Sequence, residues 1–340
     1  MTRAELWAEL TGVGLVTGEM PSAAPRGTPW PVRVMMGAAG WVGALFLLGF
    51  AGVAFAAIFR SADAAIPAGL LCCAGAFGVF VAMPRNDFAG QFGLAVSLTG
   101  QALVLVGLVQ LTHEKPQAGT FFAMAAFQAV LAWALPNYVH RAFTALSANA
   151  CLFLGAGMMG APALGTAVAA VGAALPWLFE KEMAAQPAVL EPLAYGCAIA
   201  LLHMDGSLLF GHEFWEFLRP KGEKGPEYVM WLGAAVCGAV LVFAAWRLGA
   251  RGALLAGAVA VGVSGVFAPG ISAALLVMVL GFASGRRPLL GLGILAFLGY
   301  LGHFYYSLEV TLLMKSAALC GTGLLLLGMR FLVREGRDVA

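Results

Sequence analysis

The residues most able to carry chemistry in this sequence are a few polar side chains that fall within long apolar stretches. Lys315 lies six residues after Glu309 and close to Tyr306, and Asp205 follows His203 by two residues. A polar group at membrane depth is costly, so each of these is a default candidate for binding or for proton movement. Together they form our candidate intramembrane polar site. We place Lys315 in the bundle interior, near Tyr306 or an acid from another helix.

Alternatives in which these residues have no functional role stay open. The Lys315 amine, about 9 Å below the interface at helical rise, could instead snorkel to the lipid headgroups. Glu309 is about 240° round a helix from Lys315, so an ion pair would need an acid from a different helix. His203 and Asp205 lie either inside a span or at its end. The pattern favours a helix that ends there, followed by an amphipathic surface helix over 207–218.

No metal, cofactor or catalytic site is expected. His212, Glu213 and Glu216 share a predicted surface helix, but the zinc pattern H-E-x-x-H lacks its second histidine here. The six cysteines lie in apolar runs without C-x-x-C spacing, which is typical of small buried side chains. No nucleophile, base and orienting group appear at a useful spacing, so we predict that the protein is not an enzyme.

The elements that must position these residues are transmembrane helices. Hydrophobic residues make up 61% of the 340-residue chain and charged residues 11%, against about 45–50% and 25% in soluble domains. Most apolar runs are continuous and long enough for a helix to cross a hydrocarbon core of roughly 30 Å. We predict an all-α, polytopic transmembrane helix bundle of about 12 spans (10–12). The predicted spans are 34–59, 64–83, 89–112, 118–136, 142–160, 163–179, 189–210, 228–246, 252–267, 269–285, 288–307 and 309–329.

The basic residues predict the orientation of this bundle. Thirteen of the 19 fall in one set of alternate loops and in the two terminal segments, and Lys315 lies within a span. Because the cytoplasmic side carries the Lys/Arg excess, both termini are predicted to be cytoplasmic. A net charge of +2 with scattered basic residues excludes a nucleic-acid partner. The other set of loops holds only Arg60, Lys115, Arg219, Lys221 and Lys224.

The chain divides into three parts. Residues 1–30 are predicted to be a cytoplasmic segment with a short amphipathic helix over 3–11 and a Pro-rich linker. Residues 31–332 form the transmembrane helical domain, and 333–340 a short cytoplasmic tail. The 45 glycines predict close helix packing, and Gln101, Gln128, Asn149 and His303 are predicted to make interhelical hydrogen bonds.

Two long apolar stretches are interrupted by turn-forming residues, Gly160-Ala161-Pro162 and Ala268-Pro269-Gly270. Each interruption is either a tight hairpin between two short crossings or a broken, re-entrant helix. Broken helices of this kind mark binding sites in some transporters.

Three segments together resemble a known family. Pro29-Trp30-Pro31-Val32-Arg33 precedes the first span, Arg286-Arg287-Pro288-Leu289 opens a late span, and 305–316, with the sequence YYSLEVTLLMKS, links the last two. This pattern is similar to the bacterial membrane family called domain of unknown function 4401. Glu309 stands where we expect an Asp in the family. The resemblance, which extends to the domain of unknown function 2157 and GDYXXLXY membrane proteins, implies a multi-pass protein of the bacterial inner membrane.

Two functions are compatible with these features. The leading interpretation is a non-enzymatic helical platform in an envelope complex, with membrane lipids and a small GDYXXLXY-type membrane protein as partners. The alternative is a secondary transporter whose intramembrane polar pathway involves Lys315, Glu309 or Asp205.

Overall fold

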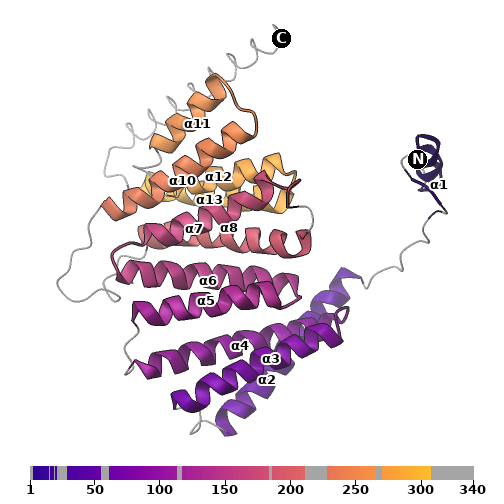
Figure 1. The fold of residues 1–340 in the computed structure, drawn as a ribbon, viewed down its shortest axis with the longest axis vertical. Helices are drawn as coiled ribbons and strands as arrows, with labels where there is room; N and C mark the ends of the chain where they lie inside the picture. The colour runs from indigo at the N-terminus through magenta and orange to yellow at the C-terminus, as the bar shows by residue number, and fades with distance from the viewer. Residues whose placement is uncertain are drawn as a thin grey trace.

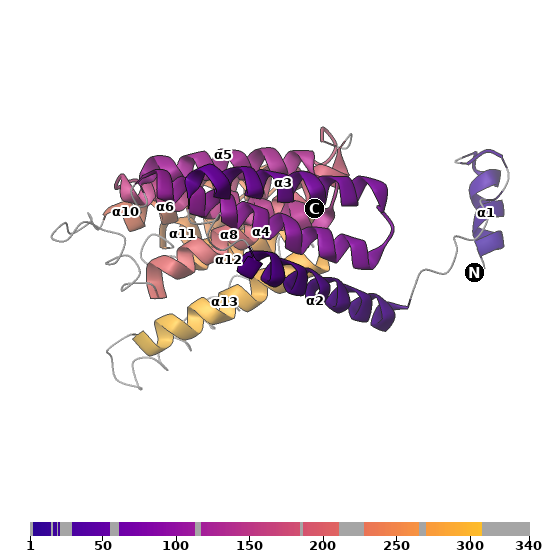
Figure 2. The same cartoon turned by 90° about the horizontal axis from the view of Figure 1, so that it is seen from below.

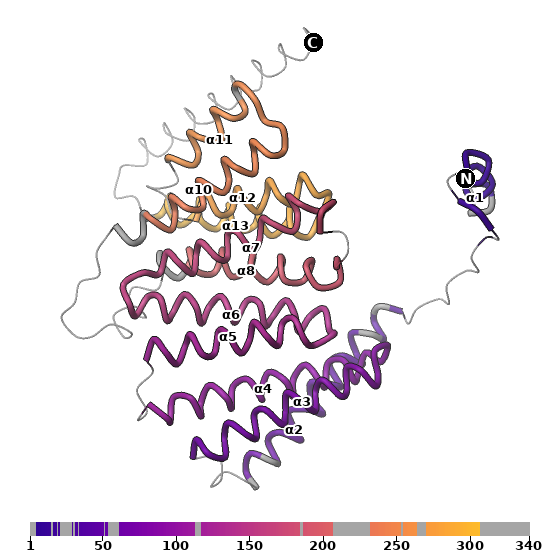
Figure 3. The backbone as a smooth tube through the Cα atoms, viewed as in Figure 1, coloured from indigo at the N-terminus to yellow at the C-terminus, as the bar shows by residue number. Residues whose placement is uncertain are grey.

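The structure is a computed structural model, traced as a tube in Figure 3. It describes residues 3–14, 16–18, 20, 29–54, 61–112, 117–183, 186–210, 228–264 and 270–307. Within these ranges the chain forms twelve α-helices and no strand, which confirms the all-α class. The helices are α1 (Arg3–Gly12), α2 (Trp30–Ala54), α3 (Ala62–Ala82), α4 (Asp87–Leu111), α5 (Ala118–Ala134), α6 (Tyr138–Met158), α7 (Ala163–Leu178), α8 (Pro187–Phe210), α10 (Tyr228–Arg247), α11 (Ala253–Ser264), α12 (Ile271–Ala283) and α13 (Arg287–Ser307).

The helices follow the predicted spans closely. Each predicted span from 34–59 to 288–307 coincides with one helix, and α1 coincides with the helix predicted over 3–11. The last predicted span, 309–329, lies outside the described residues together with Glu309 and Lys315. By length and composition, four of the described helices can cross a membrane, namely α3, α4, α8 and α13. Shorter apolar stretches of 10–17 residues lie in α2, α5, α7, α10, α11 and α12.

Most of the helices lie side by side in a stack that runs from α2 and α3 at one end to α11 at the other (Figure 1). Neighbours in the stack pack directly: α3 on α4, α5 on α6, α8 against both α6 and α7, and α12 on α13. Figure 2 shows that α2 and α13 lie on the same side of this stack. Helix α2 packs on the stack through α4, and α13 packs on it through α12.

The largest buried cluster lies in the C-terminal half of the stack. It is formed by apolar side chains of α6, α7, α8, α10, α12 and α13, including Leu201 and Leu276, which are fully buried. Two smaller clusters join α3 with α4 and α5, and α4 with α5 and α6. The C-terminal cluster surrounds the site described below.

Small residues set the closest helix contacts, as the glycine content predicts. Gly69 on α3 faces Gly100 on α4, and a Cβ atom on either would collide with the other's carbonyl oxygen. Gly196 on α8 meets the carbonyl group of Ala142 on α6 in the same way. These contacts let the backbones approach closely, which stabilises helix pairs in lipid through van der Waals packing.

The two interrupted stretches differ in structure. At the first, Gly160 has φ of +77° and turns the chain between α6 and α7, which pack together as a tight hairpin. At the second, α11 has 12 residues and α12 has 13, and both contact α10. Such helices are about 18 and 20 Å long, shorter than a hydrocarbon core of roughly 30 Å. The sequence interruption therefore separates two short helices, one on each side of residues 265–269.

Candidate functional site

The site is centred on α8, which continues through the point where we expected it to end. The sequence favoured a helix that stops near Gly206, with a separate amphipathic helix over 207–218. That interpretation is wrong for 207–210, because α8 extends to Phe210. Met204 and Asp205 are both about 1% exposed, so tertiary packing holds the helix through Gly206. Residues 211–218, with His212, Glu213 and Glu216, lie outside the described residues.

Asp205 points into the bundle from α8. Its side chain is 1% exposed, whereas His203, two residues earlier, is exposed. Two residues are about 200° apart round a helix, which explains why only one of them faces inward. The carboxylate accepts a hydrogen bond from the backbone N–H of Gly270. Its other oxygen, Oδ2, is buried and has no hydrogen-bond partner among the described residues.

Gly270 is the N-cap residue of α12, immediately before Ile271. The first N–H groups of a helix lack partners within the helix, and a carboxylate there is favoured by the helix dipole. Asp205 therefore caps α12 from a different helix. Gly270 has φ of +90°, and an added Cβ would run into the ring of Tyr300. Only glycine suits this position, because it must adopt positive φ and leave room for the tyrosine.

Two more side chains complete the surroundings of Asp205. Tyr300 on α13 is 5% exposed, and its hydroxyl donates to the carbonyl of Leu202 and accepts from the backbone N–H of Gly206. Cys237 on α10 is fully buried and lies close enough to interact electrostatically with Asp205. Helices α8, α10, α12 and α13 therefore meet around one carboxylate.

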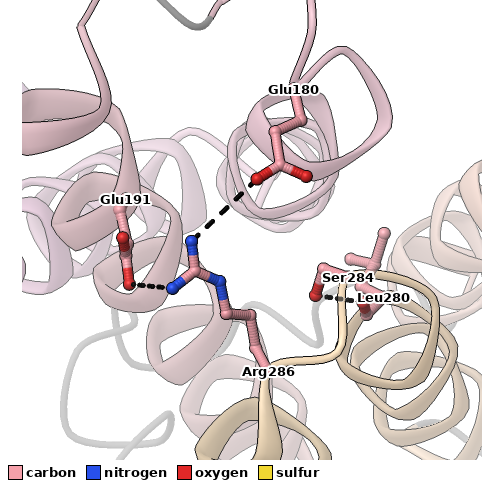
Figure 4. Close-up of polar contacts among 5 residues, drawn as sticks. All are labelled: Glu180, Glu191, Leu280, Ser284 and Arg286. Atoms are coloured by element: carbon pink, nitrogen blue, oxygen red, sulfur yellow. Dashed lines mark hydrogen bonds and ion pairs between the residues drawn. The ribbon is translucent and has the colours of Figure 1, made fainter. Parts of the chain in front are cut away.

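The opposite end of α8 carries a charged cluster, shown in Figure 4. Arg286 places one guanidinium nitrogen 3.2 Å from Glu191 and another 4.0 Å from Glu180. The same guanidinium lies over the ring of Trp177, 5.4 Å from its centre. Arg247, the last residue of α10, pairs at 3.2 Å with Glu182, which lies two residues after Glu180. The C-terminal ends of α7, α10 and α12 therefore lie at the same end of the bundle, so these three helices run parallel to one another.

This charged cluster fixes the depth of Asp205. Glu191 and Asp205 are 14 residues apart on α8, which is about 21 Å at helical rise. If the charged end marks one membrane interface, Asp205 and the start of α12 lie well inside a core of roughly 30 Å. The Oδ2 atom, which has no partner within the described ranges, is therefore an acceptor or a proton site within the apolar part of the bundle.

Of the remaining predicted site residues, Tyr306 lies within the described ranges and is not brought to Asp205. Tyr306 is 82% exposed, and its ring packs edge-on against Tyr305. Glu309 and Lys315 lie outside the described residues. Among the described residues, no three His, Cys, Asp or Glu side chains gather closely enough to hold a metal ion.

A second polar cluster, in the N-terminal half, is hydrogen-bonded around one histidine. His140 is fully buried, and its Nε2 lies 2.8 Å from Ser97 Oγ and 3.3 Å from Gln101 Nε2. Gln128 in turn donates to Gln101 at 3.3 Å, which confirms the predicted interhelical bonds of both glutamines. Because its members largely satisfy one another, this cluster is best explained as a structural contact between α4, α5 and α6.

The sequence missed several members of these clusters, among them His140, Tyr300 and Cys237. His140 was left out because the predicted span began at 142, but Asn137 caps α6 by accepting from the His140 N–H, and the helix begins at Tyr138. Asn137, three residues before His140, is a usable N-cap signal in the sequence. Nothing in the local sequence of Tyr300 or Cys237 predicts that they face Asp205, because the three residues lie on different helices.

The fold and this site define an all-helical protein whose apolar helices are long enough to suggest a membrane protein. A family model described as domain of unknown function 4401 matches residues 29–335, which is most of the chain. The chain therefore belongs to that family, as its sequence motifs indicated. No curated protein and no solved structure matches it.

Proposed function

We propose that this chain is a non-enzymatic, multi-pass protein of the bacterial inner membrane, and that it works as a secondary transporter. From sequence alone a platform in an envelope complex was the leading interpretation. The buried Asp205 reverses that order. A carboxylate at membrane depth is costly and calls for a functional explanation.

One observation supports transport above all others: one Asp205 oxygen is held by the N-terminus of α12, while the other is buried without a partner among the described residues. Transporter sites are commonly built where the N-terminus of a short helix ends inside the membrane and faces a polar group. A carboxyl with one free oxygen can gain and lose a proton without losing its cap. We infer that protonation of Asp205 is coupled to the movement of a small solute.

The transport proposal is tested in proteoliposomes that contain a pH-sensitive dye. Pools of small bacterial metabolites are added outside, and at least one pool should cause a lumenal pH change that empty liposomes do not show. Dividing an active pool into smaller pools and repeating the assay then identifies the substrate class. If no pool moves protons, the platform becomes the better proposal.

The platform remains the second candidate, and a specific feature of α13 favours it. Gly291, Gly299 and Gly302 have open space where a Cβ atom would lie, and Leu295 between them is 71% exposed. Small residues on one face of a transmembrane helix are typical of helix contacts. The proposed partner is a small GDYXXLXY-type membrane protein. Purification in a mild detergent that keeps native complexes should then recover this partner in constant stoichiometry.

Both proposals share the predicted topology, with about twelve spans and both termini in the cytoplasm. A reporter enzyme that works only in the cytoplasm is fused after Ala340. It should be active, because the Lys/Arg excess keeps the C-terminus in the cytoplasm. A matched fusion of a periplasmic reporter at the same residue should be silent. Periplasmic activity at Ala340 would contradict the predicted cytoplasmic C-terminus.

A further inference from the structure

A groove of about 700 Å³ opens between α6, α8 and the start of α13, at the charged end of the bundle. The helices that form its walls also contact one another, since α8 packs on both α6 and α13. Neither proposed function uses this groove. Its polar end at Glu191 lies about 21 Å from Asp205 at helical rise along α8, and Ile199 at its apolar end about 9 Å. Ile199 is exposed on the outer surface whereas Asp205 is buried, so the groove is a separate site.

The groove changes from polar to apolar along its length. At the end where α6, α8 and α13 begin, it is lined by Tyr138, Glu191, Arg286 and Arg287. Further along α6 and α8 it is lined by apolar side chains, including Phe143, Leu146 and Ile199. Phe143 is 45% and Ile199 39% exposed, so the apolar part lies on the outer surface of the bundle. Such a shape suits a molecule with a polar head and an apolar chain.

The charged side chains at the polar end differ in whether they already have partners. Glu191 is bound on both sides, by Arg286 at 3.2 Å and by a hydrogen bond from the Tyr138 hydroxyl. Arg286 is also shared with Glu180 and lies over Trp177. Arg287 is exposed and makes no ion pair within the part of the chain that the structure describes. The cation available to a ligand is therefore Arg287.

We propose that this groove binds an anionic membrane phospholipid, with its phosphate at Arg287 and one acyl chain against Phe143, Leu146 and Ile199. Charge complementarity favours an anionic headgroup, because the local carboxylates already have partners and Arg287 has none among the residues that the structure describes. The start of α13 at Arg287 adds the positive end of a helix dipole. The apolar length of the groove favours a lipid over a soluble phosphate, which would leave that surface uncovered.

The test compares two probes with the same chains and different headgroups, dioleoyl phosphatidylglycerol and dioleoyl phosphatidylcholine. Each is titrated against the purified full-length protein in detergent, and bound lipid is counted by native mass spectrometry. Wild type should bind phosphatidylglycerol more tightly than phosphatidylcholine. Arg287→Gln should weaken phosphatidylglycerol binding by about fivefold, the effect of one basic residue at an anionic lipid surface, and leave phosphatidylcholine binding unchanged.

Two matched controls separate this site from general attraction. Arg251→Gln removes an exposed charge that lies outside the groove, and should leave both affinities unchanged. Ile199→Trp fills the apolar part and should weaken both lipids, whereas Leu175→Trp on α7, outside the groove, should weaken neither. Equal losses for Arg287→Gln and Arg251→Gln, or equal binding of the two lipids by wild type, would overturn the proposal.

Discussion

Asp205→Asn is expected to abolish solute-driven proton flux in proteoliposomes while the protein still folds. Asn keeps a side-chain oxygen that can accept the hydrogen bond from the Gly270 N–H, so α12 remains capped. It has no proton to give or take at neutral pH, so any step that needs protonation of this side chain fails. Flux is measured with the solute pool that is active for wild type, and the melting temperature of the variant is measured in parallel.

Two further substitutions separate the proton role from the capping role. Asp205→Ala removes the cap as well, which should cost about 1 kcal/mol and lower the melting temperature by roughly 2–4 °C. Asp63→Asn is the matched control, because Asp63 is an exposed acid in the first turn of α3, and it should transport at the wild-type rate. If Asp205→Asn transports normally, the carboxylate is only a cap and the transport proposal fails.

The helices of the bundle could be predicted because lipid restricts what the chain can do. A backbone in hydrocarbon must satisfy its own hydrogen bonds, so a continuous apolar run has to be a helix. The run over 64–83 and the helix α3 (Ala62–Ala82) illustrate how closely the two agree. Helix ends were harder, as at α8, where Gly206 suggested a stop that packing overrides.

The candidate site could be predicted only in part, and the reason is geometric. Asp205 was identifiable as a polar residue in an apolar run, but the direction in which it points depends on which helices surround α8. Its partners Gly270 and Tyr300 are 65 and 95 residues further along the chain. Their positions follow from helix packing, which local periodicity does not encode. Hydrophobic periodicity is also weak here, because a helix with lipid on one side and protein on the other is apolar all round.

Gly196→Leu is expected to cause the largest loss of stability, because it forces α6 and α8 apart. Any Cβ at this position collides with the carbonyl oxygen of Ala142 and with the side chain of Ala145. Neither atom can move away without a shift of the α6 backbone, since both belong to a helix packed on α5 and α7 as well. Overpacking of this kind costs about 1–3 kcal/mol or more, and should lower the melting temperature by roughly 5 °C or more.

Gly78→Leu on α3 makes the same chemical change where a side chain has room. Gly78 is exposed, and nothing lies within 4 Å of the position of its Cβ atom. Leu is also a better helix former than Gly, so this variant should melt at or slightly above the wild-type temperature. Thermal unfolding of both variants in the same detergent measures the difference. Equal melting temperatures would mean that the close contact between Gly196 and Ala142 contributes nothing to the stability of the bundle.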